Sequence, residues 1–164
     1  MTAFDRFTLW LAWLAAGLFV ATGIMLTWEV AARYFFTAPT IWAAELSQLC
    51  LIWGSLLAMP WALGTGRHIA VDAVAVLLPR RVRRVTETFA MLVVAAVSGV
   101  VTVYGAWIAW DSFVRGRTTG SLLDLPSWVW EASVPIGAAL LCVQAVIQTG
   151  RAWSGQWNAT ESHE

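Results

Sequence analysis

The sequence predicts an all-α integral membrane protein with four transmembrane helices. Four runs of 22, 21, 23 and 19 residues carry no charged side chain; they cover residues 7–28, 46–66, 88–110 and 132–150. A helix of about 20 residues rises about 30 Å, which matches the hydrocarbon thickness of a bilayer. The composition agrees, because 59% of the residues are hydrophobic and 12% are charged. We therefore expect a single membrane domain over residues 1–164, without a separate soluble domain.

The elements follow in order along the chain. The first apolar run is longer than the apolar core of a secretory signal, about 7 to 15 residues, so we expect it to remain as the first span. Pro60 should kink the second span, and Pro135 should disturb the first turns of the fourth. The predicted elements are spans at about 7–28, 43–64, 88–110 and 132–150, an interfacial segment at 67–79 and a polar C-terminal tail at 154–164.

The arginines indicate the orientation of the chain. All ten basic residues are arginine, and cytoplasmic connections of membrane proteins are enriched in them. With both termini cytoplasmic, seven arginines lie inside and only Arg33, Arg115 and Arg117 lie outside. Eleven of the twelve tryptophans fall near span ends, as expected of interfacial indole rings. We therefore predict cytoplasmic N- and C-termini.

Three charged residues flank the first connection. Glu29 and Arg33 are four residues apart, so they share a face if the first helix continues through them. Glu45, at the start of the second span, could complete a structural charge cluster with both. The alternative is a solvated ion pair of little energetic importance. No nucleophile or set of metal ligands accompanies these carboxylates, so we expect no catalytic residue here.

The second connection combines an apolar segment with a group of arginines. Residues 67–79 are too short to span a bilayer, and we expect a helix that lies in the interface and stops at Pro79. His68 and Asp72 are four apart and could share a hydrogen bond, although a lone interfacial histidine could also relay protons. The only other histidine is His163, so we expect no haem, no metal site and no other cofactor. The residues expected to contact lipid headgroups are Arg80, Arg81, Arg83 and Arg84.

Small residues recur every four positions along the second span. They are Cys50, Gly54, Ala58 and Ala62, and we predict helix packing along this stripe. No span centre holds an Asp, Glu, Arg, Lys or His, which an ion pathway would require. We therefore do not expect this chain to transport a solute alone.

The residues then resemble a known family, and the resemblance covers nearly the whole chain. Its most specific parts are Glu29-x-x-x-Arg33-Tyr34-x-Phe36-x-x-Pro39-x-x-Trp42-x-x-Glu45-Leu46, then Trp53, Gly66-x-His68-Ile69-x-Val71-Asp72, Leu78-Pro79, Leu125-Pro126-x-Trp128 and Pro135-x-Gly137. This order resembles the small membrane subunit, DctQ type, of tripartite ATP-independent periplasmic (TRAP) transporters. The resemblance marks Tyr34, Pro39, Trp42, His68, Asp72, Pro79, Pro126 and Pro135 as family-motif residues.

The resemblance implies a function as part of an assembly. A large multi-span subunit would carry the substrate and sodium sites, and a periplasmic binding protein would deliver a small solute, typically one bearing a carboxylate. This chain would be a scaffold in the bacterial inner membrane, without enzymatic activity, and would bind membrane lipids but no nucleic acid. Two alternatives stay open. They are the small subunit of a tricarboxylate-type tripartite transporter and the membrane anchor of a redox enzyme.

Overall fold

The described residues of the chain form only helices and their connections. The computed structural model describes residues 3–37, 40–65, 80–121 and 123–154. The helices are α1 (Ala3–Phe36), α2 (Ile41–Gly64), α4 (Arg80–Arg115), α5 (Trp128–Glu131) and α6 (Ser133–Ser154). The predicted interfacial segment 67–79 and most of the predicted tail at 154–164 lie outside the described residues.

Four stretches of helix are long and apolar enough to cross a membrane. They are Ala3–Phe36, Trp42–Gly64, Thr88–Arg115 and Trp128–Arg151, which confirms the predicted four-span fold class. The fourth combines α5 and α6, which are separated at Ala132. Pro135 explains this interruption, because it has no N–H to donate to the carbonyl oxygen of Glu131 and its ring crowds that oxygen. Pro60, in contrast, lies buried inside α2 without ending it.

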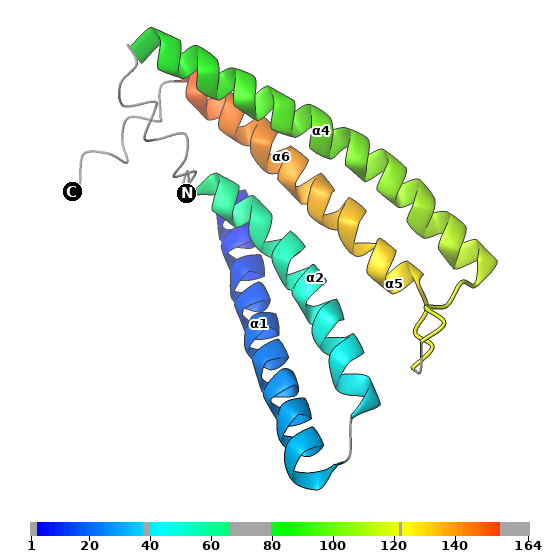
Figure 1. The fold of residues 1–164 in the computed structure, drawn as a ribbon. Helices are drawn as coiled ribbons and strands as arrows, with labels where there is room; N and C mark the ends of the chain where they lie inside the picture. The colour runs from blue at the N-terminus through cyan, green and yellow to red at the C-terminus, as the bar shows by residue number, and fades with distance from the viewer. Residues whose placement is uncertain (1–2, 38–39, 66–79, 122, 155–164) are drawn as a thin grey trace.

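The helices pack as two antiparallel hairpins. Helix α1 packs on α2, α4 packs on α6, and α2 joins the two hairpins by packing on α6 (Figure 1). Helices α2 and α6 run in parallel, since Trp53 in the middle of α2 contacts Val129 of α5, just before α6 begins, and Gly64 at the end of α2 contacts Gln148 near the end of α6. We call the end where α1 ends and α2 begins, which also holds the 116–127 loop, the loop end, and the opposite end the terminal end.

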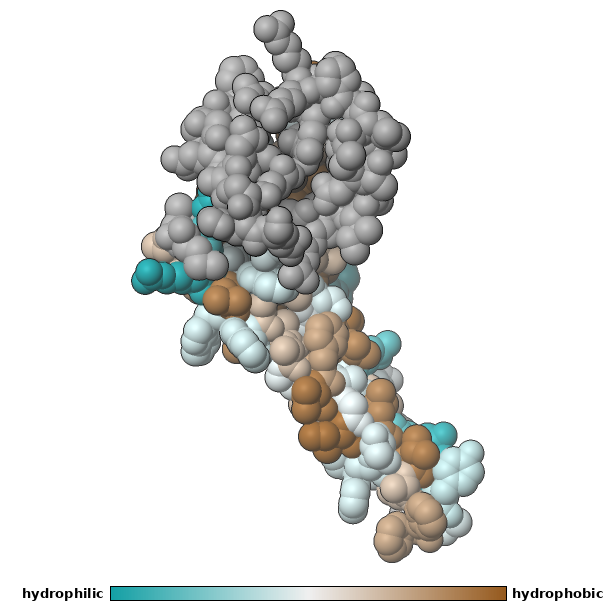
Figure 2. Space-filling view, turned by 90° about the vertical axis from the view of Figure 1, so that its left-hand side faces the viewer, coloured by the Kyte–Doolittle hydropathy of each residue, from teal (hydrophilic) through white to brown (hydrophobic). Residues whose placement is uncertain are grey.

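The interior of the described bundle is made of small and polar side chains. Ala15, Ala43 and Ala145 are at most 1% exposed, whereas Trp10 and Trp107 are 70% exposed. Figure 2 shows exposed apolar side chains along one described face of the molecule. A protein that folds in water would bury such large apolar side chains first, so the exposed surface is suited to lipid. Small interior residues let the helix backbones approach closely instead.

Each of the three main helix interfaces contains a close approach at a glycine. Gly54 of α2 lies against α1, where a Cβ atom would meet the Ala15 carbonyl oxygen at 3.5 Å. Gly105 of α4 faces the ring of Pro135 in α6. Two close approaches join α2 and α6: a Cβ added to Gly64 would meet the end of the Gln144 side chain, and a Cβ added to Gly137 would lie 2.7 Å from the Cβ of Leu56. Gly137 is therefore required by the packing of the two hairpins.

Candidate functional site

An ion pair at the end of α1 joins two of the three predicted cluster residues. Arg33 donates a hydrogen bond to Glu29 Oε1 at 2.5 Å, and the Glu29 side chain is only 11% exposed. Helix α1 continues through both residues, so their four-residue spacing places them on one face. Glu45 forms no ion pair with Arg33 in the described structure, and its Oε2 atom is buried without a hydrogen-bond partner. The Arg33 guanidinium group is instead paired with the Glu29 carboxylate on the same helix.

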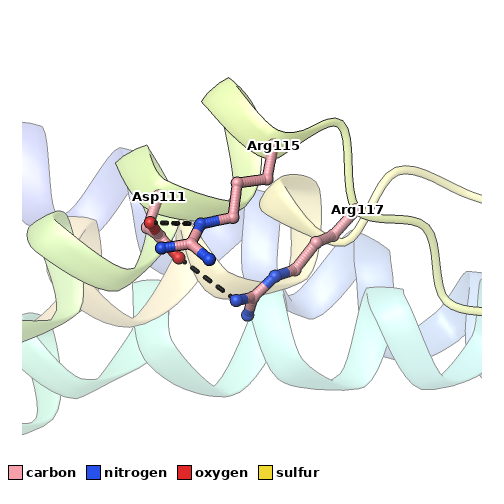
Figure 3. A network of polar contacts seen from close by, with 3 residues as sticks. All are labelled: Asp111, Arg115 and Arg117. Carbon is pink, nitrogen blue, oxygen red and sulfur yellow. Dashed lines mark hydrogen bonds and ion pairs between the residues drawn. The ribbon is translucent and has the colours of Figure 1, made fainter.

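A second charged group at the loop end was not predicted from the sequence. Asp111 accepts a hydrogen bond from Arg115 at 2.7 Å and another from Arg117 at 3.2 Å, as Figure 3 shows. One carboxylate thus holds two guanidinium groups, one on its own helix and one on the following loop. This arrangement fixes the start of the 116–127 loop to the end of α4.

The 116–127 loop is a compact turn. Gly116 and Gly120 have φ values of 60° and 62°, which glycine adopts without steric cost. Thr118 and Pro126 form an isolated bridge, and Thr119 N–H donates to the Leu125 carbonyl oxygen at 2.9 Å. Pro126, predicted as a family-motif residue, therefore lies where the loop closes.

We expect loss of Arg33 to destabilise the chain more than loss of Arg115. The Arg33→Ala variant leaves the mostly buried Glu29 carboxylate without its cation, whereas Asp111 in Arg115→Ala keeps Arg117. The difference should be about 1 kcal/mol in the free energy of unfolding, since an unpaired partly buried charge is unfavourable. Thermal unfolding of both purified variants measures it. Equal losses would show that the Glu29–Arg33 pair is only solvated surface.

The loop end also contains a pocket between α2, the 116–127 loop and α5. Its volume is about 270 Å³, and Glu45, Gln48, Ile52, Thr119, Ser121 and Trp130 line it. The Thr119 and Ser121 hydroxyl groups lie 2.7 Å apart and share a hydrogen bond. Trp130 Nε1 is buried without a hydrogen-bond partner, as is Glu45 Oε2. Two of the residues that line the pocket therefore each carry a covered polar atom without a partner, one an acceptor and one a donor.

The terminal end has polar contacts that sequence reasoning missed. Arg151 donates to Asp5 Oδ2 at 2.6 Å, which links the last turn of α6 to the first turn of α1. Gln148 donates to the Gly64 carbonyl oxygen at 2.9 Å and so ties α6 to the end of α2. Gln144 is fully buried, and neither of its amide atoms has a hydrogen-bond partner. The partners lie 84 and 146 residues apart in sequence, so no local pattern signals them.

The other predicted residues are placed as follows. Tyr34 is 79% exposed and Trp42 is 41% exposed, both at the loop end. Gly54 packs on α1 within the chain, whereas Ala62 is exposed and Ala58 is half-buried. Helix α4 begins at Arg80, but nothing is described of the side chains of Arg80, Arg81, Arg83 and Arg84. Pro39, His68, Asp72 and Pro79 lie outside the described residues.

The described residues contain no group of three or more His, Cys, Asp or Glu side chains that could hold a metal ion. The charged side chains of the described residues lie instead at the two ends of the bundle.

Comparison with known proteins places the sequence in a family. A family model described as "Tripartite ATP-independent periplasmic transporters, DctQ component" matches residues 22–155. The chain belongs to the DctQ family.

Curated proteins similar to this DctQ-family chain are also transporter permeases. It is 32% identical over 82 residues to the sialic acid TRAP transporter permease protein SiaT of Haemophilus influenzae (strain 86-028NP), a match that covers 50% of the chain and 13% of SiaT. It is 26% identical over 102 residues to the C4-dicarboxylate TRAP transporter small permease protein DctQ of Rhodobacter capsulatus, covering 62% of the chain and 44% of that protein.

A third relative gives the longest of these matches. The chain is 27% identical over 135 residues to the C4-dicarboxylate TRAP transporter small permease protein DctQ of Vibrio cholerae serotype O1 (strain ATCC 39315 / El Tor Inaba N16961), which covers 69% of the chain and 58% of that protein. The chain thus spans less than two thirds of the length of each of these relatives. The family is one of membrane transporter subunits, in agreement with the four apolar helices.

Proposed function

We propose that this chain is the small membrane scaffold subunit of a TRAP secondary transporter in the bacterial inner membrane. It would assist sodium-coupled uptake of a small solute that bears a carboxylate, together with a large multi-span subunit and a periplasmic binding protein. The observation that carries the proposal is the DctQ-family match over residues 22–155, in a chain whose span centres contain no Asp, Glu, Arg, Lys or His. Such spans offer no site for a coupling cation. The names of the relatives, sialic acid and C4-dicarboxylate, support an acidic solute.

The large partner would bind laterally, within the bilayer. Large apolar side chains cover the outward faces of α1 and α4, where Trp13 is 72% exposed and Val103 is 69% exposed. These faces suit either lipid or another membrane subunit. The interfacial segment 67–79 and the arginines at the start of α4 would anchor the cytoplasmic side to anionic headgroups. The loop end would then face the periplasmic binding protein.

Reconstitution tests this assignment. We expect liposomes that contain this chain alone to accumulate neither labelled sialic acid nor labelled succinate under an inward sodium gradient. Liposomes that also contain the large subunit, with the binding protein outside, should accumulate one solute of an acidic panel. Sodium-driven uptake by the chain alone would overturn the scaffold assignment. Full uptake by the large subunit and binding protein without this chain would equally contradict it.

Reporter fusions test the orientation. We expect a reporter placed after Gly120 to show a periplasmic position, and reporters placed after Arg84 and Glu164 to show cytoplasmic positions. The reason is the division of seven arginines against three between the two sides. Alkaline phosphatase and green fluorescent protein fusions measure the two positions independently. A cytoplasmic signal from the Gly120 fusion would reverse the topology.

A further inference from the structure

The pocket at the loop end has an uncompensated negative charge. Three arginines lie at this end of the described structure, and each already has a carboxylate partner. Arg33 pairs with Glu29, while Arg115 and Arg117 both pair with Asp111. Within the described part of the chain, Glu45 has no ion pair with any of them. A carboxylate beside lipid is unfavourable unless it is paired, so a cation from outside the chain would complete the site.

The pocket also has an unused hydrogen-bond donor. Trp130 Nε1 is covered by protein and has no acceptor, although buried polar groups nearly always have a partner. The hydroxyl groups of Thr119 and Ser121 bond to each other, and such a pair keeps one hydrogen for a further acceptor. A ligand with a cation beside Glu45, and with an acceptor such as a phosphate oxygen beside Trp130, would therefore pair both groups.

The lining changes from polar to apolar along α2. Glu45, Gln48 and Ile52 are three and four residues apart, so they follow one another down the same helix face from the loop end toward the span. A lipid matches this order, since its headgroup lies at the interface and its acyl chains lie deeper. A small soluble amine would have no apolar part to pack against Ile52.

We propose that this pocket binds the zwitterionic headgroup of a phosphatidylethanolamine-type lipid. The ammonium group donates to the Glu45 carboxylate, and a phosphate oxygen accepts from Trp130 Nε1–H and from the Thr119–Ser121 hydroxyl pair. Glu45 and Trp130 are partly exposed as whole residues, but these two atoms are covered in this structure, so lipid binding requires a small movement of each side chain. The volume of about 270 Å³ leaves room for a headgroup of this size.

This chemistry predicts a selectivity among lipids. Phosphatidylcholine has no N–H on its quaternary nitrogen and cannot donate to Glu45. Phosphatidylglycerol has no cation, and its net negative charge is repelled by the carboxylate. Phosphatidylethanolamine alone of the three satisfies both the acceptor and the donor of the pocket.

Native mass spectrometry of the purified full chain, with equal amounts of the three lipids, tests the proposal. We expect one retained phosphatidylethanolamine per chain. Retention should fall about tenfold in Glu45→Gln, because a charge-assisted hydrogen bond contributes about that factor. Trp130→Phe, which keeps the ring and removes the N–H, should lower retention less. The matched control is Asp124→Asn, which removes an exposed carboxylate of the same loop and should retain the lipid like the wild type.

Thermal unfolding provides a second readout. Without lipid, Glu45→Gln should be at least as stable as the wild type, because it removes an unpaired charge. Added phosphatidylethanolamine should raise the melting temperature of the wild type and of Asp124→Asn, but not that of Glu45→Gln.

Three results would overturn the proposal. The first is equal retention of the three lipids, or unchanged selectivity in Glu45→Gln. The second is displacement of the lipid by an equal concentration of free phosphoethanolamine, which would assign the pocket to a soluble zwitterion. The third is a carbodiimide crosslink from Glu45 to a lysine of the large subunit in the lipid-saturated complex, which would assign the pocket to protein contact.

Discussion

Replacing Gly137 with alanine is expected to lower the stability of the bundle by about 2 to 3 kcal/mol, the range for overpacking a close contact. The added Cβ atom would lie 2.7 Å from Leu56 Cβ and 3.3 Å from the Leu56 carbonyl oxygen. Neither atom is the end of a flexible side chain, so α6 must move away from α2. Because α2 and α6 join the two hairpins, this movement weakens the contact between the hairpins.

Thermal unfolding of the purified chain, followed by tryptophan fluorescence, measures the loss. The matched control is Gly150→Ala on the same helix, where an added Cβ atom meets nothing within 4 Å. This control should unfold at or slightly above the wild-type temperature, because alanine favours helix more than glycine does. If the two variants unfold together, the approach of Gly137 to Leu56 does not limit stability.

Breaking the Asp5–Arg151 pair is expected to destabilise the chain by about 2 kcal/mol. Their side chains are only 16% and 24% exposed, so the pair lies between a solvated surface bridge and a buried one. Each charge also lies at the favourable end of its own helix dipole, with Asp5 in the first turn of α1 and Arg151 in the last turn of α6.

A double-mutant cycle isolates the contribution of the pair. The variants are Asp5→Asn, Arg151→Gln and their combination, with unfolding free energies measured in one detergent. The double variant should be less destabilised than the sum of the two single variants, by about 1 kcal/mol. Arg6→Gln serves as a control, since it removes an exposed cation at the same end of the bundle. Strict additivity in the cycle would mean that the two helices are held together by other contacts.

The sequence predicted the parts of this fold that depend on local pattern. Charge-free runs located the four spans, and the four-residue spacing of Glu29 and Arg33 predicted their ion pair. The helices are longer than the runs, however, with α1 at 34 residues and α4 at 36 residues. A charge ends an apolar run but does not end a helix, because the backbone hydrogen bonds continue into the headgroup region.

Long-range contacts could not be predicted from one sequence. The Trp53 Nε1–H bond to the Val129 carbonyl oxygen joins residues 76 positions apart, and nothing near either residue indicates the other. Gly137 appeared in the sequence only as part of the Pro135-x-Gly137 motif, whereas the structure shows that it limits the approach of two helices. Glu45 was expected beside Arg33, but it lies in the pocket with Trp130, a residue 85 positions later that no local pattern connects to it.

The packing order α1, α2, α6, α4 has a consequence for permeation. Helices that enclose a water-filled passage must form a ring, in which the first and last members touch along their length. Here the main contacts make a row, so the two outermost helices close no lumen between them. A row of helices that binds a second membrane protein extends that protein sideways in the bilayer. In the proposed transporter, the solute would therefore pass beside this chain and not between its helices.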